Sequence, residues 1–378
     1  MDIPEFLSEF AQSIIGLDYG DIFLVGGSVR DLWLGQSVSD YDLLCSGDAI
    51  QLAEKLESKG LIEILALHIA FGTAKVRLVF DERVLDIASP RLETYAFPGA
   101  LPTVTYPASL EEDLKRRDFT INAIALRLGK PTAQHFFLDP FDGLQDLKAG
   151  IVQVLHPISY IEDPTRVIRA LRFARRFDFR IGSTDRTLIR EALSKKEIVG
   201  MTARVRGLRV GIELKRLLES DHWLNAAIEL AELGGWSLCR ARLDQQVQLT
   251  EPLYQLPTFE MRLAWLLWRT TDRDQILGEL GLNAKALKKI ELIETLSHSQ
   301  TDKPSLALLS KYEQLNESEL NLLYALRPSL KEFYRLMHNS KPQKKGADLL
   351  REGIQGQAIQ AALEEEFQLK YQSHHRKD

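Results

Sequence analysis

Asp40 and Asp42, separated only by Tyr41, are the residues of this sequence that most clearly suggest chemistry. They lead into the apolar run Leu43-Leu44-Cys45, so the segment has the composition of a short β-strand. Side chains at positions i and i+2 of a strand point the same way, and both carboxylates can reach one pair of metal ions about 3.5–4 Å apart. The pair therefore predicts a two-metal Mg²⁺ site for nucleotidyl transfer, with Asp40 and Asp42 as metal ligands. Alone, the pattern also fits a polar turn before a strand.

A third carboxylate would help such a site, and Asp86 is our candidate. It lies within the apolar run Val84-Leu85-Asp86-Ile87, which favours a second strand. We therefore predict Asp40, Asp42 and Asp86 as the catalytic carboxylates. The alternative is that Asp86 is an ordinary aspartate on an edge strand.

Two adjacent glycines, Gly26 and Gly27, stand between an apolar run and a segment with helical spacing. Glycine lets the backbone approach a phosphate closely, and the N-terminus of the following helix offers unpaired N–H groups. We predict a nucleotide-binding turn in which Ser28 adds a hydroxyl and Arg30 a guanidinium. A tight turn with a solvated Arg30 is the alternative.

A cluster of charge follows at Arg116-Arg117-Asp118, with Asn122 close behind. Two cations and one acceptor are enough to hold triphosphate oxygens and a ribose hydroxyl. Asn122 is expected to hold the ribose or to cap the local backbone. A charged helix N-terminus on the protein surface would have the same composition.

The stretch that begins at Glu162 predicts a helix with one apolar and one arginine-rich face. Asp163 and Arg166, one turn apart, offer an acceptor beside a donor. Cytosine and adenine both present an amine donor next to a ring-nitrogen acceptor, whereas guanine and uracil present the reverse order. The pair therefore predicts selection of CTP and ATP, with each buried unpaired group of a wrong base costing about 1–3 kcal/mol. We expect Glu162 to orient Arg166, and Arg169 and Arg172 to reach the phosphates, although a solvated face is the default for such charges.

The elements that must position these residues change character along the chain. β-like runs alternate with helical patterns over the first 130 residues and indicate an α+β half, whereas strand signals vanish from about residue 160 and helical patterns run to the end. Residues 138–147 have the turn composition of a connector, and residues 339–346 form a later break. Strands are expected at 21–25, 41–45, 61–65, 73–80 and 83–88, and a helix at 49–58.

The 378 residues include 48 basic and 53 acidic side chains, a net charge of −5 that seems to argue against a nucleic-acid partner. Residues 151–216, however, contain 15 basic and 7 acidic side chains, which favours binding to RNA phosphates. We expect neither a secretory signal nor a membrane span. Cys45 and Cys239 lack the spacing of a metal site and are expected to be buried in a protein of a reducing compartment.

As an ordered set, these motifs resemble the class II tRNA nucleotidyltransferases, the CCA-adding enzymes and bacterial poly(A) polymerases of the polymerase β-like superfamily. The similar segments are, in chain order, 26–31 with 40–42, 115–123, 139–147, 162–174, 209–216 and 346–353. The resemblance implies an α+β fold with a mixed-sheet catalytic head at 1–138, followed by an all-α neck at 139–200, body at 201–338 and tRNA-binding tail at 339–378.

The resemblance also implies a cytoplasmic enzyme that adds C, A or both to the 3′ end of tRNA from CTP and ATP, without a template, and releases pyrophosphate. Its partners would be the tRNA acceptor end and nucleoside triphosphates, with no membrane. CC addition, A addition and poly(A) synthesis stay open as narrower activities. A catalytically idle RNA-binding relative would have lost the carboxylates, and a small-molecule nucleotidyltransferase would not explain the 162–172 stretch.

Overall fold

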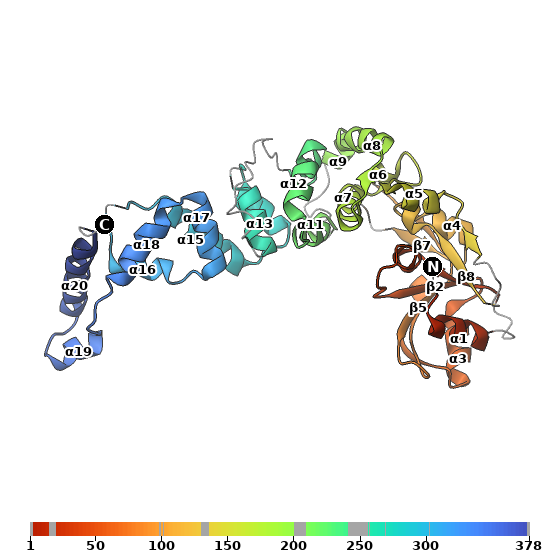
Figure 1. Ribbon diagram of the computed structural model, residues 1–378, viewed down its shortest axis with the longest axis horizontal. Helices are drawn as coiled ribbons and strands as arrows, with labels where there is room; N and C mark the ends of the chain where they lie inside the picture. The colour runs from red at the N-terminus through yellow and green to blue at the C-terminus, as the bar shows by residue number, and fades with distance from the viewer. Residues whose placement is uncertain are drawn as a thin grey trace. The chain divides into compact units, whose positions relative to one another are not determined.

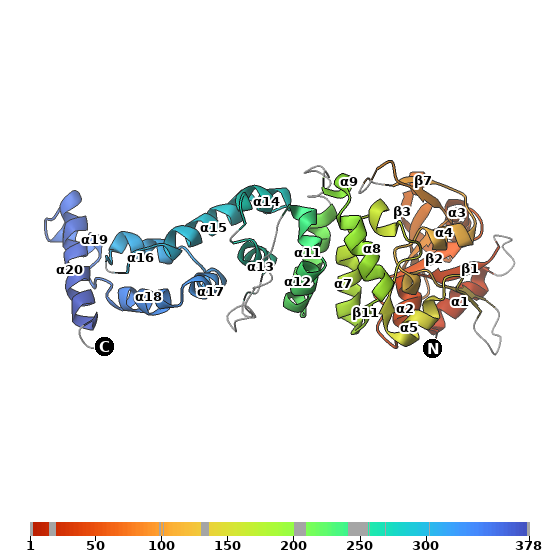
Figure 2. The ribbon, with the colours of Figure 1, turned by 90° about the horizontal axis from the view of Figure 1, so that it is seen from above.

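The computed structural model divides the chain into two compact units, Met1–Leu238 and Cys239–Asp378 (Figures 1 and 2). The structure describes residues 3–14, 20–97, 100, 102–129, 136–199, 209–240, 256, 258–268, 270–301 and 303–375. The four-part division into head, neck, body and tail stays a prediction. The predicted nucleotide-binding and catalytic residues all belong to the first unit, which contains all of the described strands.

A seven-stranded mixed sheet forms the base of the first unit, in the order β3-β4-β5-β2-β1-β8-β9. Strand β2 pairs in parallel with β5, and the other neighbouring pairs are antiparallel. All four residues of β1 are buried, because β1 lies near the middle of the sheet and has protein on both faces. The strands are β1 (Ile22–Val25), β2 (Tyr41–Cys45), β3 (Ile62–His68), β4 (Thr73–Leu78), β5 (Val84–Ala88), β8 (Ala125–Leu128) and β9 (Phe137–Leu138).

Helices pack on this sheet, and two of them, α3 and α4, begin at side-chain caps. The side chain of Asp48 accepts from the first backbone N–H groups of α3, and Ser109 with Glu112 forms a capping box at the start of α4. One hydrophobic cluster joins β1 to α4 through Phe23, Val25 and Leu114. The early helices are α1 (Glu5–Ile14), α2 (Gly27–Trp33), η1 (Ile69–Phe71), α3 (Ala49–Ser58), α4 (Leu110–Lys115), η2 (Thr120–Asn122) and α5 (Gly143–Ala149).

The expected helix from Glu162 is interrupted, which corrects the sequence analysis. Helix α6 (Ser159–Glu162) ends before Asp163, whose backbone is extended, and α7 (Arg166–Phe177) begins after Pro164. Glu162 therefore lies on a different helix from Arg166. The prediction that no strand follows residue 160 was also wrong, because β11 (Arg180–Ile181) pairs with β10 (Ile151–Val152).

The rest of the first unit is helical apart from a small two-stranded sheet, β6 (Leu92–Thr94) with β7 (Thr103–Thr105). Helix α7 packs against α11 and α12. The other described helices of the first unit are α8 (Ser183–Leu193), α9 (Lys196–Val199), α11 (Gly211–Leu218), α12 (Trp223–Glu232) and η4 (Gly235–Cys239), the last of which ends at the boundary between the units.

The described part of the second unit is entirely helical. Helix α15 packs against α14 and α17, while α18 and α19 pack against α20. Its helices are α13 (Phe259–Leu266), α14 (Arg273–Glu279), α15 (Ala284–Ser297), α16 (Leu306–Tyr312), α17 (Glu317–Leu326), α18 (Ser329–Asn339), α19 (Gly346–Arg351) and α20 (Gln357–His375).

The predicted fold class is confirmed: a mixed-sheet N-terminal part is followed by helices. The predicted strand at 41–45 and helix at 49–58 match β2 and α3 to the residue. Cys45 and Cys239 are both buried, as expected. Within the described residues, no helix is both long and apolar enough to cross a membrane.

Candidate active site

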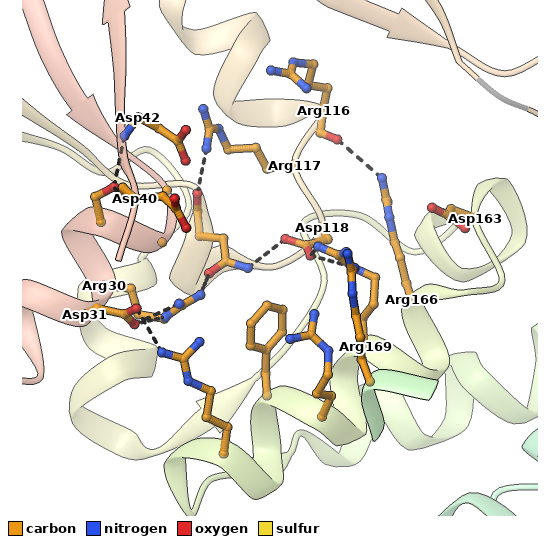
Figure 3. Close-up of a pocket in the computed structure, with 18 of the residues that line it drawn as sticks. Arg30, Asp31, Asp40, Asp42, Arg116, Arg117, Asp118, Asp163, Arg166 and Arg169 are labelled. Carbon is orange, nitrogen blue, oxygen red and sulfur yellow. Dashed lines mark hydrogen bonds and ion pairs between the residues drawn. The ribbon is translucent and has the colours of Figure 1, made fainter. Parts of the chain in front are cut away.

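A pocket of about 700 Å³ lies between the sheet and helix α7, within the size range of ligand sites. Nine arginines and six acidic residues line it, and this excess of positive charge suits an anionic ligand. Figure 3 shows Asp40 and Asp42 at one end and Asp163 with Arg166 at the other. The arginines are Arg30, Arg116, Arg117, Arg166, Arg169, Arg172, Arg176, Arg209 and Arg216, and the acids are Asp31, Asp40, Asp42, Glu93, Asp118 and Asp163.

Asp40 and Asp42 stand at the open start of β2, whose later residues are buried. Ser28 holds this segment in place: its hydroxyl donates to the backbone oxygen of Asp40 at 2.9 Å and accepts from the backbone N–H of Asp42 at 3.2 Å. Ser28 is buried, and both of these bonds engage its hydroxyl. In this structure Ser28 therefore fixes the two carboxylates relative to the glycine turn.

Asp86 lies directly beside Asp42, because the two residues are register partners in the parallel strands β5 and β2. Cross-strand partners project from the same face of a sheet. Asp86 lines a second, smaller pocket that Asp40 also lines. The three predicted catalytic carboxylates are thus brought together at the edge of two adjoining pockets.

The carboxylate end of the site carries concentrated negative charge. Its depth in the protein raises the pKa of Asp42 above the ordinary value, and Asp86 and Asp40 add to this rise, while Arg117 opposes it. Carboxylate oxygens are the ligands that Mg²⁺ prefers. The described residues include no compact group of three or more His, Cys, Asp or Glu side chains in a metal-binding arrangement. The assignment of Asp40 and Asp42 as ligands of a divalent cation stays a prediction, and Asp86 stands next to Asp42.

The glycine turn allows a close approach between β1 and Arg117. Gly26 has φ of +69°, a conformation that favours glycine, and a Cβ there would lie 2.6 Å from Nη1 of Arg117. Gly27 starts the short helix α2. Arg117 also donates to Asp113 at 3.0 Å and to the backbone oxygen of Asn122 at 3.4 Å. The turn therefore leaves room for a guanidinium beside the carboxylates, as Figure 3 shows.

Arg30 is buried rather than solvated. Only 4% of the residue is exposed, and it donates to Asp31 at 2.8 Å and to the side chain of Asn122 at 2.5 Å. Its guanidinium carbon lies 5.0 Å from the ring centre of Phe173 and 4.7 Å from that of Phe177. Burial lowers the pKa of Arg30, although Asp31 opposes the shift. Arg30 thus joins α2 to α7 beneath the pocket.

Arg116 is held by two acids that our sequence analysis did not single out. It donates to Asp113 at 2.7 and 2.9 Å and to Glu93 at 2.6 Å. Asp113 is fully buried, and burial would raise its pKa, but Arg117 and Arg116 hold the pKa below the ordinary value. Nothing in the local sequence indicates that Glu93, more than 20 residues away, meets Arg116.

Asp118 links the Arg116–Asn122 segment to helix α7. It accepts from the amide of Asn122 at 2.8 Å and from Nε of Arg169 at 3.0 Å. Burial would raise the pKa of Asp118, but Arg169 and the bond from Asn122 hold it below the ordinary value. The same ion pair raises the pKa of Arg169. These three predicted residues form one connected network along the floor of the pocket (Figure 3).

Asp163 and Arg166 lie close together but have other partners. Asp163 accepts from Thr165 Oγ1 at 2.6 Å and from Arg209 at 2.5 Å. Arg166 donates to the hydroxyl of Ser159 and to the backbone oxygen of Arg116 at 3.3 Å. Both residues line the pocket, with exposed fractions of 6% and 3%. A ligand in the pocket would therefore meet an acceptor and a donor that are already oriented.

Glu213 on α11 forms ion pairs with two arginines of α7 and with one arginine of its own helix. It lies 3.3 Å from Arg169, 3.4 Å from Arg172 and 2.8 Å from Arg216. Arg172 also lies over the ring of Phe173, at 4.6 Å. The segment 209–216, which the sequence analysis noted only as a motif, thus supplies Arg209 and Arg216 to the pocket lining and Glu213 as the acidic partner behind it.

Glu162 is the predicted site residue that the structure places elsewhere. Its carboxylate lies 3.5 Å from His156, and it does not line the pocket. The expected orientation of Arg166 by Glu162 is not observed, because Ser159 and Arg116 take that place. The helix break before Asp163 explains the difference.

Residues 22–153 match the profile of the poly A polymerase head domain. The N-terminal sheet region thus resembles a poly A polymerase head domain. The matched residues contain the glycine turn, the three carboxylates and the Arg116–Asn122 segment, whereas Asp163, Arg166 and Arg209 lie beyond them.

Two curated relatives resemble the head domain and the residues after it. The A-adding tRNA nucleotidyltransferase of Aquifex aeolicus is 41% identical over 53% of this chain and 23% of its own length. The CC-adding tRNA nucleotidyltransferase of Deinococcus radiodurans is 40% identical over 42% of this chain and 41% of its own length. The chain thus spans less than half of the length of these relatives.

A solved structure described as a CCA-adding enzyme in its apo form II resembles the whole chain. It has a TM-score of 0.80 and 26% identity, and the match covers 98% of this chain and 93% of the other. The similarity therefore extends from the head domain through the helices that follow it.

Proposed function

We propose that the protein is a template-independent tRNA nucleotidyltransferase that transfers C, A or both from CTP and ATP to the 3′ end of tRNA and releases pyrophosphate. One observation supports this proposal above the others. A single arginine-lined pocket has the Asp40 and Asp42 carboxylates at one end and the Asp163/Arg166 pair at the other. A nucleoside triphosphate has the same polarity, with its phosphates at one end and its base at the other.

Asp163 and Arg166 would read the base. The Asp163 carboxylate accepts from an exocyclic amine, and the Arg166 guanidinium donates to the neighbouring ring nitrogen, an order that both cytosine and adenine satisfy. Because both side chains are almost fully buried, a base with the reverse order would leave them unpaired at about 1–3 kcal/mol each. The protein would then act as its own template.

Arg117 and the arginines of α7 would hold the triphosphate. Arg117 and Asp42 both line the pocket, and Arg117 opposes the raised pKa of Asp42, so its positive charge acts on the carboxylate end. Arginine suits phosphate because its planar fork donates two parallel hydrogen bonds. Asp118 and Asn122, fixed by Arg169 and Arg30, would meet the ribose.

Mg²⁺ is the cofactor that we infer for the carboxylates. When bound, Mg²⁺ would neutralise the phosphates and lower the pKa of the attacking hydroxyl. Asp40 and Asp42 would hold it, and Asp86 stands beside Asp42 toward the second pocket. Ser28 would keep the ligands in place through the backbone of β2.

The RNA partner would be the acceptor end of tRNA, in line with the activity in the names of the two relatives. The segment 151–216 carries the excess of basic residues that RNA phosphates require. Such an enzyme would work in the cytoplasm.

Addition of A alone is a second candidate. The relative with 41% identity is an A-adding enzyme, whereas the structure that matches the full chain is described as a CCA-adding enzyme. An Asp-plus-Arg pair accepts both bases, so it supports neither activity over the other.

The substitution Asp42→Ala tests the proposal. We expect it to abolish nucleotide incorporation under Mg²⁺ while the affinity for tRNA, measured by filter binding, stays within about twofold of wild type, because Asp42 holds metal and not RNA. The substitution Glu63→Ala, of an exposed acid that lines neither pocket, is the matched control and should leave incorporation unchanged. Full activity of Asp42→Ala would contradict the proposal.

A further inference from the structure

A second pocket, of about 490 Å³, adjoins the candidate active site. Val38, Ser39 and Asp40 line both pockets, so the two meet at the start of β2. Asp42 lines the larger pocket and Asp86 the smaller one. The carboxylates therefore lie at the boundary between the larger, arginine-lined pocket and the smaller pocket.

Two basic residues, Lys75 and Arg83, face the smaller pocket. Lys75 on β4 is the register partner of Asp86 on β5, and Asp86 is the register partner of Asp42 on β2. Register partners project from the same face of a sheet, so the three side chains form one row across adjacent strands. Two strand spacings place the Cα of Lys75 about 10 Å from that of Asp42.

Phosphoryl transfer requires two substrates, a triphosphate and an attacking hydroxyl, which reach the transferred phosphorus from different directions. The attacking and leaving oxygens lie roughly in line on opposite sides of the transferred phosphorus. If the larger pocket holds the triphosphate, the attacking hydroxyl must approach the transferred phosphorus from the side opposite the leaving pyrophosphate. The smaller pocket adjoins the larger one at the carboxylates and so offers a space for that approach.

We propose, on the basis of the proposed function, that the smaller pocket receives the 3′-terminal nucleotide of the RNA and that Lys75 binds its phosphate. One sugar separates a nucleotide's 3′ hydroxyl from its own phosphate. A cation one strand beyond Asp86 is therefore positioned for that phosphate while the hydroxyl lies at the carboxylates.

Lys75 is available for such a contact. Its side chain is 46% exposed, and its ammonium lies 3.7 Å from Asp86, which is longer than a hydrogen bond. Arg83 adds positive charge at the rim of the same pocket, where its guanidinium carbon lies 4.4 Å from the ring centre of Phe6. Arg77, two residues along β4 from Lys75, instead pairs with Glu63 at 2.5 Å and does not line the pocket.

The test combines protein and RNA changes in steady-state kinetics with full-length protein. Wild type, Lys75→Ala, Lys75→Arg and the control Arg77→Ala are compared on a tRNA whose last phosphodiester is either natural or a neutral methylphosphonate. In wild type the neutral linkage should lower kcat/KM about tenfold, the size expected for one charge-assisted hydrogen bond. Lys75→Ala should raise the KM for natural tRNA by about as much and should leave the KM for nucleotide unchanged.

The decisive result concerns the drop in kcat/KM that the neutral linkage causes, here called the linkage effect, which Lys75→Ala alone should abolish. With Lys75→Ala the methylphosphonate should change kcat/KM less than about twofold, whereas Arg77→Ala should retain the full tenfold effect and Lys75→Arg most of it. A full linkage effect in Lys75→Ala would overturn the proposal and would indicate that Lys75 only neutralises Asp86. Wild-type protein that incorporates no nucleotide at all would instead contradict the proposed function itself, and the pocket assignment with it.

Discussion

Asp42 of β2 and Asp86 of β5 are register partners in neighbouring parallel strands, although 43 residues of sequence separate the two positions. The pairing brings the third predicted carboxylate next to the D-x-D pair without any local motif to indicate it. Both strands lie in the interior of the sheet and have hydrogen-bonded neighbours on each side, so the backbone holds the two carboxylates in fixed relative positions.

Substitution of Asp86 tests this relationship. We expect Asp86→Asn to lower kcat about 100- to 1,000-fold at saturating nucleotide and tRNA, because the amide removes a negative charge beside the metal ligands. The KM for nucleotide should change little, since Asp86 lines the second pocket and not the one with the arginines. A variant with the kcat of wild type would exclude Asp86 from the catalytic set.

The pKa of Asp118 predicts a pH dependence of stability. Arg169 and Asn122 hold the folded-state pKa below the ordinary aspartate value, so this carboxylate stabilises the folded protein above the unfolded-state pKa. The contribution should be fully present at neutral pH and should disappear as the pH falls from the ordinary aspartate range through the lower folded-state pKa.

Urea unfolding of wild type and Asp118→Asn at several pH values measures that contribution. At pH 7 the variant should be less stable by about 2–4 kcal/mol, because it leaves the partly buried Arg169 with one acidic partner fewer. The difference should shrink toward acid pH. A difference that stays constant from pH 7 to acid would show that packing, and not the charge of Asp118, causes it.

Arg209 is expected to control nucleotide selection through Asp163. It donates to Asp163 at 2.5 Å and to the backbone oxygen of Ala100 at 2.9 Å, so it fixes the acceptor that would read the base. We expect Arg209→Ala to reduce the preference for CTP and ATP over UTP and GTP about tenfold, with a smaller change in kcat for the favoured nucleotides. Single-nucleotide incorporation assays measure each ratio.

The exposed Arg190 on α8 provides a charge-matched control for this experiment. Arg190→Ala should retain the selectivity of wild type. We expect Arg209 to act on the base only through Asp163. If Arg209 had a purely structural role, its substitution would instead lower the incorporation of all four nucleotides by a common factor. That outcome would remove Arg209 from the selection mechanism.

Much of the fold could be predicted from local sequence. The segment 41–45 alternates and ends in apolar residues, and the helix at 49–58 has an aspartate cap, so both were located to the residue. The break between α6 and α7 was missed, although it has a local signal. Pro164 disfavours a helical conformation at Asp163, and the apolar periodicity of the following helix obscured this effect.

The burial of the site residues could not be predicted from local patterns. Arg30 looked like a phosphate ligand, but Phe173 and Phe177 enclose it, and they come from a helix more than 140 residues away. The contacts of Arg116 with Glu93 and of Asp163 with Arg209 also join residues more than 20 positions apart in the sequence. Residue types and spacing identified the chemistry, whereas the partners that orient each side chain depend on the tertiary fold.

The central claim is the proposal that the protein adds C, A or both to tRNA and reads the incoming base itself. The most direct measurement incubates purified protein and Mg²⁺ with tRNA transcripts that end at the discriminator base, at C or at CC, and offers each nucleotide alone and then CTP with ATP. Product lengths distinguish CCA, CC, A and poly(A) addition. We predict extension by CTP, ATP or both, with UTP and GTP used at least about tenfold less efficiently. Extension by UTP or GTP at the rate of CTP and ATP, or no extension of any transcript, would contradict the account.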